Sequence, residues 1–127
     1  MHENHLFEYA VIRIVPRVER EEFLNAGVIV YCAKHKYLQV KFTIDPVRLN
    51  CFCKELDVVQ IHENLRAFER ICVGGIASGP IGKFDMASRF RWLTATRSTV
   101  VQSSKVHPGF CIDPATTLVD LYKQLVL

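Results

Sequence analysis

The sequence contains no long hydrophobic run and no leader-like segment. Its longest stretch without a charged residue, residues 71–82, contains four glycines and one proline. A transmembrane helix needs about 20 apolar residues, so this stretch is excluded as a membrane span. The first five residues, MHENH, lack the basic, apolar and small-residue pattern of a secretory signal. We therefore expect a cytoplasmic protein that makes no contact with a membrane.

Cysteine is present, but not in the patterns of a disulfide framework or a metal site. The five cysteines are an odd number, which in a chain without a signal predicts free thiols. Zinc sites use cysteine pairs separated by roughly two to four residues. Cys51 and Cys53 have one residue between them, and on a helix they would point about 200° apart. We expect no metal and no cofactor, and interpret the cysteines as small hydrophobic residues.

Local motifs of nucleotide binding and nucleophilic catalysis are also missing. Neither G-x-G-x-x-G nor G-x-x-x-x-G-K-[ST] occurs, and G-x-S-x-G is absent. No cysteine stands beside a histidine, as a thiol nucleophile with an adjacent base would. Four aspartates that a nuclease would cluster around metal are better explained as helix caps. These absences weigh against several common classes of enzyme.

What is present is the composition of a globular domain. The chain has 127 residues, of which 50% are hydrophobic and 23% charged. A chain of this length buries roughly two thirds of its unfolded surface, so it folds without a metal or disulfide. We expect a single domain over residues 1–127 and find no internal repeat.

Three segments near the start of the chain predict β-strands. Residues 7–15 are dominated by Phe, Tyr, Val and Ile, are apolar on both faces and end before Pro16, which favours a central strand. Residues 28–33 predict a second strand. In residues 37–44 hydrophobic and polar side chains alternate, which is typical of a strand with one buried face. Together the three segments predict an antiparallel meander.

Helices are expected in the rest of the chain, each after an aspartate. Asp45 and Asp113 are followed by proline, a combination typical of helix starts. The predicted helices cover residues 46 to about 54, 58 to about 73, 86 to about 96, and the segment from 114 onward. One late strand is expected over residues 98–106, ended by His107-Pro108-Gly109. The predicted class is α+β: an antiparallel sheet of about four strands, a meander of three plus one late strand, packed against three to four helices.

Acidic residues are missing from one long stretch. The 27 residues between Asp85 and Asp113 contain no acid, but they include Arg89, Arg91 and Arg97. Residues 80–127 carry six basic and three acidic side chains, so the whole net charge of +3 lies in this part of the chain. Such an imbalance favours an anionic partner. The alternative, that these arginines pair with acids from elsewhere in the fold, stays open.

Several polar residues in and before this stretch are candidates for binding. Arg97 and Ser98 fall where a helix is expected to give way to a strand, and His107 precedes Pro-Gly, where it could bind an anion or move a proton. Arg13 interrupts an apolar strand; a buried arginine must be paired, and Glu22 is a candidate partner. The predicted anion- or partner-binding set is Arg13, Arg89, Arg91, Arg97, Ser98, Ser104 and His107.

Two long segments resemble a small bacterial family, domain of unknown function 3037. They are YAVIRIVPRVEREEFLNAGVIVY and RFRWLTATRSTVVQSSKVHPGFCIDPATTLVDLYKQLV, in which W-L-T-A-x-R-S-T-V-[VI]-Q-x-S is the most specific block. Lys105 departs from the proline expected before Val-His, which puts the local turn in doubt. The resemblance implies a compact bacterial protein whose relatives are often encoded beside kinase-like proteins of the kind found as toxins in toxin–antitoxin pairs. It implies no activity.

We carry three functional hypotheses. The first is a non-enzymatic module that binds a protein partner, for which a kinase-like toxin is the candidate, through the basic C-terminal block. The second is an enzyme or sensor for a phosphorylated or nucleotide ligand, which requires Arg13, Arg97, Ser98 and His107 to converge, with His107 as acid–base group.

The third hypothesis is weak nucleic-acid binding, with Phe90 and Trp92 as stacking residues. A pI of about 8.7 is only mildly basic, which disfavours it. Pairing of two copies through a strand edge or the terminal helix stays open.

Overall fold

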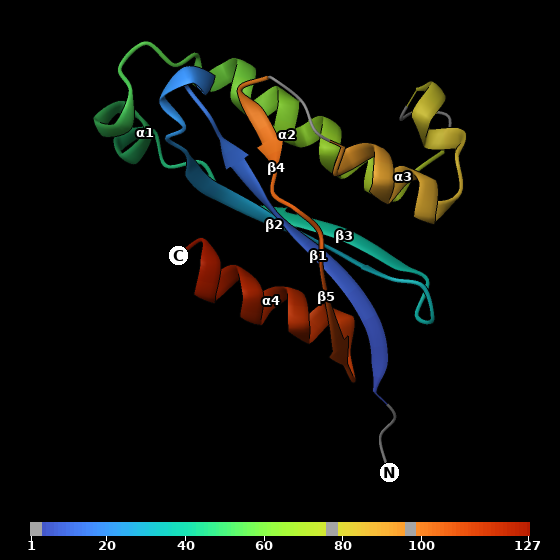
Figure 1. The fold of residues 1–127 in the computed structure, drawn as a ribbon. Helices are drawn as coiled ribbons and strands as arrows, with labels where there is room; N and C mark the ends of the chain where they lie inside the picture. The colour runs from blue at the N-terminus through green and yellow to red at the C-terminus, as the bar shows by residue number, and fades with distance from the viewer. Residues whose placement is uncertain (1–3, 76–78, 96–98) are drawn as a thin grey trace.

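One antiparallel sheet of five strands runs through the described part of the molecule (Figure 1). The structure, a computed structural model, describes residues 4–75, 79–95 and 99–127. Its strands are β1 (His5–Ile14), β2 (Leu24–Cys32), β3 (Tyr37–Phe42), β4 (Val101–Ser103) and β5 (His107–Cys111). β2 lies between β3 and β1, while β4 and β5 both pair with the other edge of β1. This topology confirms the predicted meander, with β1 in a central position.

The far edge of β1 carries two short strands where the sequence predicted one. β4 pairs with residues 12–14 of β1, and β5 pairs with residues 5–9. Pro108 was expected to end a strand, but it lies within β5, opposite Glu8. Proline is tolerated in an edge strand because its nitrogen can face away from the neighbouring strand and cost no ladder hydrogen bond. Pairing with β1 therefore overrides the local turn signal.

Four α-helices in the described residues follow the predicted caps. They are α1 (Pro46–Phe52), α2 (Val58–Val73), α3 (Met86–Leu93) and α4 (Pro114–Leu125). Each begins after an aspartate whose carboxylate accepts a backbone N–H of the first turn. The bond from Ser88 N to Asp85 Oδ1, for example, is 2.7 Å. Short 3₁₀ helices lie over Val18–Arg20 and Pro80–Lys83. The α+β class is confirmed, although α1 and α3 end slightly earlier than predicted.

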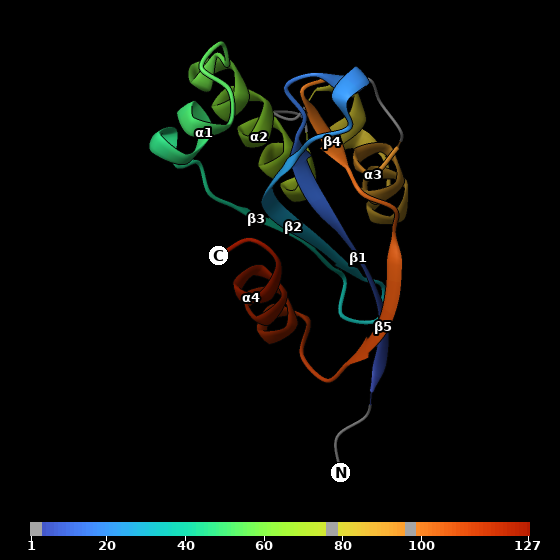
Figure 2. The same cartoon turned by 60° about the vertical axis from the view of Figure 1, so that its left-hand side comes forward.

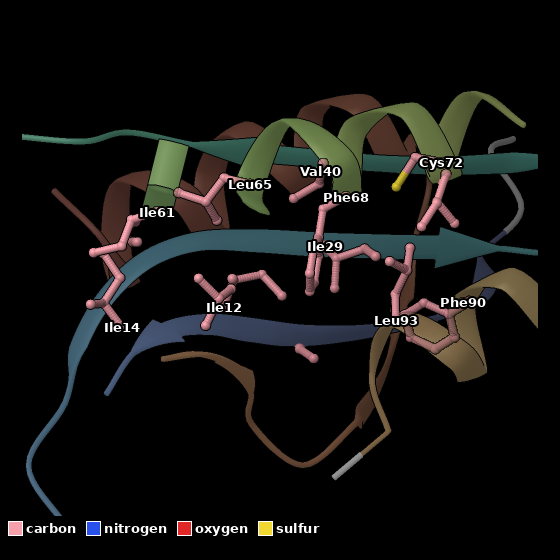
Figure 3. Packing of buried hydrophobic residues seen from close by; sticks show 14 of the residues in the cluster. Ile12, Ile14, Ile29, Val40, Ile61, Leu65, Phe68, Cys72, Phe90 and Leu93 are labelled. Atoms are coloured by element: carbon pink, nitrogen blue, oxygen red, sulfur yellow. The ribbon is translucent and has the colours of Figure 1, made fainter. Parts of the chain in front are cut away.

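The helices cover the two faces of the sheet differently (Figures 1 and 2). α2 and α3 enclose the larger core on one face, where Phe68 of α2 points toward Ile29 of β2 (Figure 3). α4 encloses a smaller core on the opposite face, with Leu118 and Tyr122 against Val28 and other β2 residues. Amphipathic helices thus bury both faces of β2, which explains the apolar run over residues 28–32.

Alternation along β1 decides which side chains lie on the α4 face. Ala10, Ile12 and Ile14 belong to the α2–α3 core, so Arg13 points to the opposite face. On that face α4 packs chiefly against β2 and β3. In the half formed by β1, β4 and β5, Phe7 and Cys111 belong to the α4 core and Tyr9 packs against it. We use the name Arg13 strip for five side chains on this face: Tyr9, Arg13, Gln102 and His107 from these strands, and Phe23, which precedes β2 and contacts Arg13.

Candidate functional site

The basic C-terminal block does not form one patch in its described residues. Arg91 is exposed on α3, and α3 covers the face of the sheet that carries the larger core. His107 is exposed on β5, opposite Tyr9, and belongs to the other face of the sheet. Arg97 and Ser98 lie outside the described residues, so their binding roles stay predictions. Residues that are neighbours in the sequence are thus separated by the sheet.

Arg89, predicted as a binding residue, uses two of its three guanidinium nitrogens in hydrogen bonds inside the protein. Its Nη1 donates to Ile71 O at 2.8 Å and Cys72 O at 2.7 Å, and its Nε donates to Phe84 O at 3.1 Å. The first two acceptors are carbonyls of the last turn of α2. No backbone N–H within the helix donates to the carbonyls of this turn. Arg89 is 8% exposed and therefore serves as an internal C-terminal cap that joins α2 to α3.

Gly74 makes room for this cap. It follows α2 with a φ of +80°, and a Cβ at this position would lie 2.7 Å from Arg89 Nη1. Glycine is thus required here both by the backbone conformation and by the approach of the guanidinium.

Ser104, a second predicted site residue, is also committed to the fold. It is buried between β4 and β5, where its backbone N–H donates to Val11 O at 2.8 Å. Its hydroxyl accepts from Val11 N at 2.8 Å and donates to Lys105 O at 2.9 Å. The side chain thus replaces a backbone carbonyl of the ladder at the point where the register shifts. This geometry favours a structural role for Ser104.

Arg13 is different, because no acid in the described part of the chain forms an ion pair with it. The sequence suggested Glu22 as its partner, but the Glu22 carboxylate accepts from Arg20 Nε, so that expectation is wrong. Within the described chain, Arg13 forms no hydrogen bond or ion pair. Its contact is with the aromatic ring of Phe23, whose centroid lies 4.0 Å from the guanidinium carbon. A half-buried cation is therefore held on an aromatic face without a counter-ion.

The residues opposite Arg13 on both neighbouring strands carry amide side chains. Asn25 pairs with it on β2, and Gln102 pairs with it on β4. Asn25 Nδ2 donates to Leu125 O at 3.0 Å, which fixes the amide against the end of α4. Arg13 Nε and Asn25 Oδ1 are buried without a hydrogen-bond partner among the described residues. Each unpaired buried group lowers the free energy of unfolding by about 1–3 kcal/mol, so this row of side chains destabilises the fold.

Arg13 and His107 do not converge on one point. The His107 and Tyr9 rings are 5.2 Å apart, which places the imidazole beside position 9 of β1. Positions 9 and 13 are separated by about 13 Å along a strand at roughly 3.3 Å per residue. This spacing gives the enzyme hypothesis no support, and the other two members of its proposed set, Arg97 and Ser98, lie outside the described residues.

Two adjoining concavities contain none of the side chains of the Arg13 strip in their linings. They have volumes of about 290 and 580 Å³ and share Pro16, Arg17, Cys53 and Glu55. Arg17 forms an ion pair with Glu55 at 3.7 Å, and Arg20 of the smaller concavity pairs with Glu22. Both arginines that line these concavities therefore have an acidic partner, which Arg13 lacks in the described chain.

The described side chains also limit metal and thiol chemistry. In the ranges the structure covers, no group of three or more His, Cys, Asp or Glu is arranged to hold a metal ion. All five cysteines are free, and burial raises the pKa of the Cys72 thiol to about 12. A thiol with such a pKa is protonated at neutral pH and is a poor nucleophile. None of the described helices has the length and apolar character needed to cross a membrane.

A family model described as "Protein of unknown function (DUF3037)" matches residues 9–126, nearly the whole chain. The chain belongs to the DUF3037 family. No curated protein and no solved structure matches it. Membership confirms the resemblance seen in the sequence. The DUF3037 match covers residues 9–14 of β1 and all of β4 and β5.

Sequence reasoning singled out Arg13 and His107 but missed the side chains around them. Phe23 was passed over because it precedes the predicted second strand, which begins four residues earlier than expected, at Leu24. Gln102 was read only as part of a polar stretch. The period-two alternation of β1 was the available signal, since it places Tyr9 and Arg13 on one face.

Proposed function

We propose that the protein is a non-enzymatic module that acts in the cytoplasm and binds a protein partner through the Arg13 strip. The observation that carries this proposal is the half-buried Arg13 guanidinium, which has no counter-ion among the described residues. Burying a charge without a partner is costly, so a retained one is best explained by a partner that supplies the opposite charge.

Charge complementarity identifies the kind of surface that fits. β1 and β5 direct the basic residues His5, Arg13 and His107 to the same face as Tyr9, and exposed Lys105 lies in the link between β4 and β5. None of these strip residues is acidic. A partner with an acidic segment would therefore be attracted rather than repelled.

The shape and composition of the strip favour a protein over a small molecule. Phe23 is 44% exposed, Tyr9 is half-buried, and both flank cations, which is the residue mixture enriched in protein interfaces. The span of about 13 Å from Arg13 to the His107 position suits an extended chain segment better than a compact metabolite. The metabolite-enzyme hypothesis gains no support from this spacing.

The partner to test first is a kinase-like protein of the toxin type, because relatives in the family are often encoded beside such proteins. The tagged full-length chain is used to capture partners from its native cell, and the captured kinase-like protein is then purified and its affinity measured. Arg13→Gln is compared with Arg91→Gln, which removes the same charge from the exposed face of α3.

We expect Arg13→Gln to weaken binding at least tenfold, equivalent to about 1.4 kcal/mol, and Arg91→Gln to leave it unchanged. Equal affinity of the Arg13→Gln variant and the unmodified chain would contradict the site assignment. Recovery of only a second copy of the chain would replace the kinase-like partner with a homodimer.

A further inference from the structure

We infer that the Arg13 site receives a carboxylate, the side chain of an aspartate or glutamate of the partner protein, rather than a phosphate. This inference rests on the proposed function for the location of the interface and adds the chemistry of the group bound there. It follows from the number of charges around Arg13, from the end of α4 beside it, and from the atoms that Arg13 leaves accessible.

The local charge matches a single negative charge. Arg13 is flanked in the sheet by two neutral amides, Asn25 and Gln102, and stacks on neutral Phe23. A phosphate monoester carries a charge of about −1.5 to −2 at neutral pH and is typically held by a cluster of arginines. A carboxylate carries one charge, which one guanidinium neutralises.

The other cation near the end of α4 is already used by the helix. Arg48 Nη1 donates to Val126 O at 3.3 Å, and Asn25, opposite Arg13, donates to the neighbouring carbonyl, Leu125 O, at 3.0 Å. The C-terminus of a helix carries about half a negative elementary charge, which Arg48 offsets. Within the described chain, Arg13 is therefore the arginine of this region whose guanidinium has no hydrogen bond and stays available to a single anionic group.

The accessible atoms of Arg13 fit a carboxylate end-on. Phe23 covers one face of the guanidinium, and Nε is buried. The two terminal nitrogens form no hydrogen bond and are not among the buried unpaired atoms, so they reach solvent. Two parallel N–H groups in one plane match the two oxygens of a carboxylate. Gln102 Nε2 donates to Thr99 O at 2.7 Å. This amide nitrogen is therefore occupied, and the Arg13 guanidinium is the donor that binds the carboxylate.

The test uses acetate and inorganic phosphate as probes on the full-length chain. Each is titrated at matched ionic strength while the side-chain nitrogen–proton NMR signals of the arginines are followed. Arg13→Lys identifies the Arg13 signal and also keeps the positive charge while removing the planar fork. Arg91→Gln is the matched control for loss of an exposed arginine.

Acetate is expected to shift the Arg13 signal saturably at lower concentration than phosphate, and to leave the internally bonded Arg89 signal in place. The Arg91→Gln variant should keep this response, and thermal stabilisation by acetate should be lost in Arg13→Lys. Saturation by phosphate at lower concentration than acetate, or no response to either anion, would overturn the inference. If partner binding still depends on Arg13 in that case, the proposed function stands without it. If acetate binds but the partner is insensitive to Arg13→Gln, the proposed function fails instead.

Discussion

Arg89 and Arg13 place the same guanidinium in two different surroundings. Arg89 directs its N–H groups to the carbonyls of Ile71, Cys72 and Phe84, so its burial stabilises the junction of α2 and α3. Arg13 lies on the opposite face of the sheet, stacked on Phe23, and finds neither a carbonyl nor a carboxylate in the described chain. The difference separates an arginine used by the fold from one left available to a ligand.

The largest expected effect breaks the first half of this comparison. Arg89→Met keeps much of the side-chain volume but leaves three carbonyls without their donors. Buried acceptors that lose a charged partner are costly, so we expect the free energy of unfolding to fall by about 3–5 kcal/mol. Urea denaturation measures it, and a loss below about 1 kcal/mol would show that the cap contributes little.

Gly74→Ala attacks the same cap from the backbone side. Both Gly74 and Gly75 have a positive φ, but an added Cβ would meet the Arg89 guanidinium only at Gly74. The strained backbone alone costs about 1–3 kcal/mol. We expect Gly74→Ala to lower the free energy of unfolding more than its control, Gly75→Ala. In an Arg89→Met background the difference between the two should shrink, and an unchanged difference would argue against the contact.

Arg13→Met tests the second half, with a smaller effect on stability. The variant loses an arginine–aromatic contact of about 0.5–1 kcal/mol, but it also removes an unpaired buried donor that costs about 1–3 kcal/mol. The second effect is larger, so the free energy of unfolding should stay equal or rise by about 0–2 kcal/mol. Chemical denaturation of the purified variant decides the sign. A clear loss of stability would place Arg13 with Arg89, among the residues used by the fold.

Local sequence signals predicted most of the fold because the interactions behind them are local. Asp45 and Asp113 cap helices through residues only two or three positions away, and alternation in β3 reflects one strand and its neighbours. β5 was missed for the opposite reason. Its Pro108-Gly109 sequence is typical of a turn, and only pairing with β1, about a hundred residues earlier in the chain, makes it a strand.

The site was less predictable, because it depends on partners that sequence distance hides. Arg89 was grouped with the binding residues, although its acceptors Ile71 and Cys72 come from the preceding helix. Arg13 was assigned to Glu22, and only the fold reveals that Arg20 takes that carboxylate. A charge pattern can locate arginines, but whether each one is already satisfied is a property of the tertiary structure.

The smallest expected effect is on the pH dependence of the free energy of unfolding, which should differ between the Arg89 and Arg13 regions. Asp85 caps α3, the helix that carries Arg89, and its hydrogen bonds from Ser88 hold the pKa of this carboxyl below its ordinary value of 3.8. A depressed pKa contributes stability that is present above 3.8 and is lost as the pH falls through the folded-state value. Asp85→Asn should therefore flatten the acid side of the pH–stability curve slightly. Asp113, which caps α4, has a pKa lowered in the same way by Thr116 and supplies a separate increment.

No carboxylate of the described chain forms an ion pair with Arg13, so Arg13→Met should leave the acid limb of the curve unchanged. Unfolding curves collected between neutral and acidic pH for both variants make the comparison. An acid limb that changes with Arg13→Met would mean that a carboxylate of the chain senses this guanidinium after all. Arg13 would then have a counter-ion within the protein, and the distinction between the two arginines would be lost.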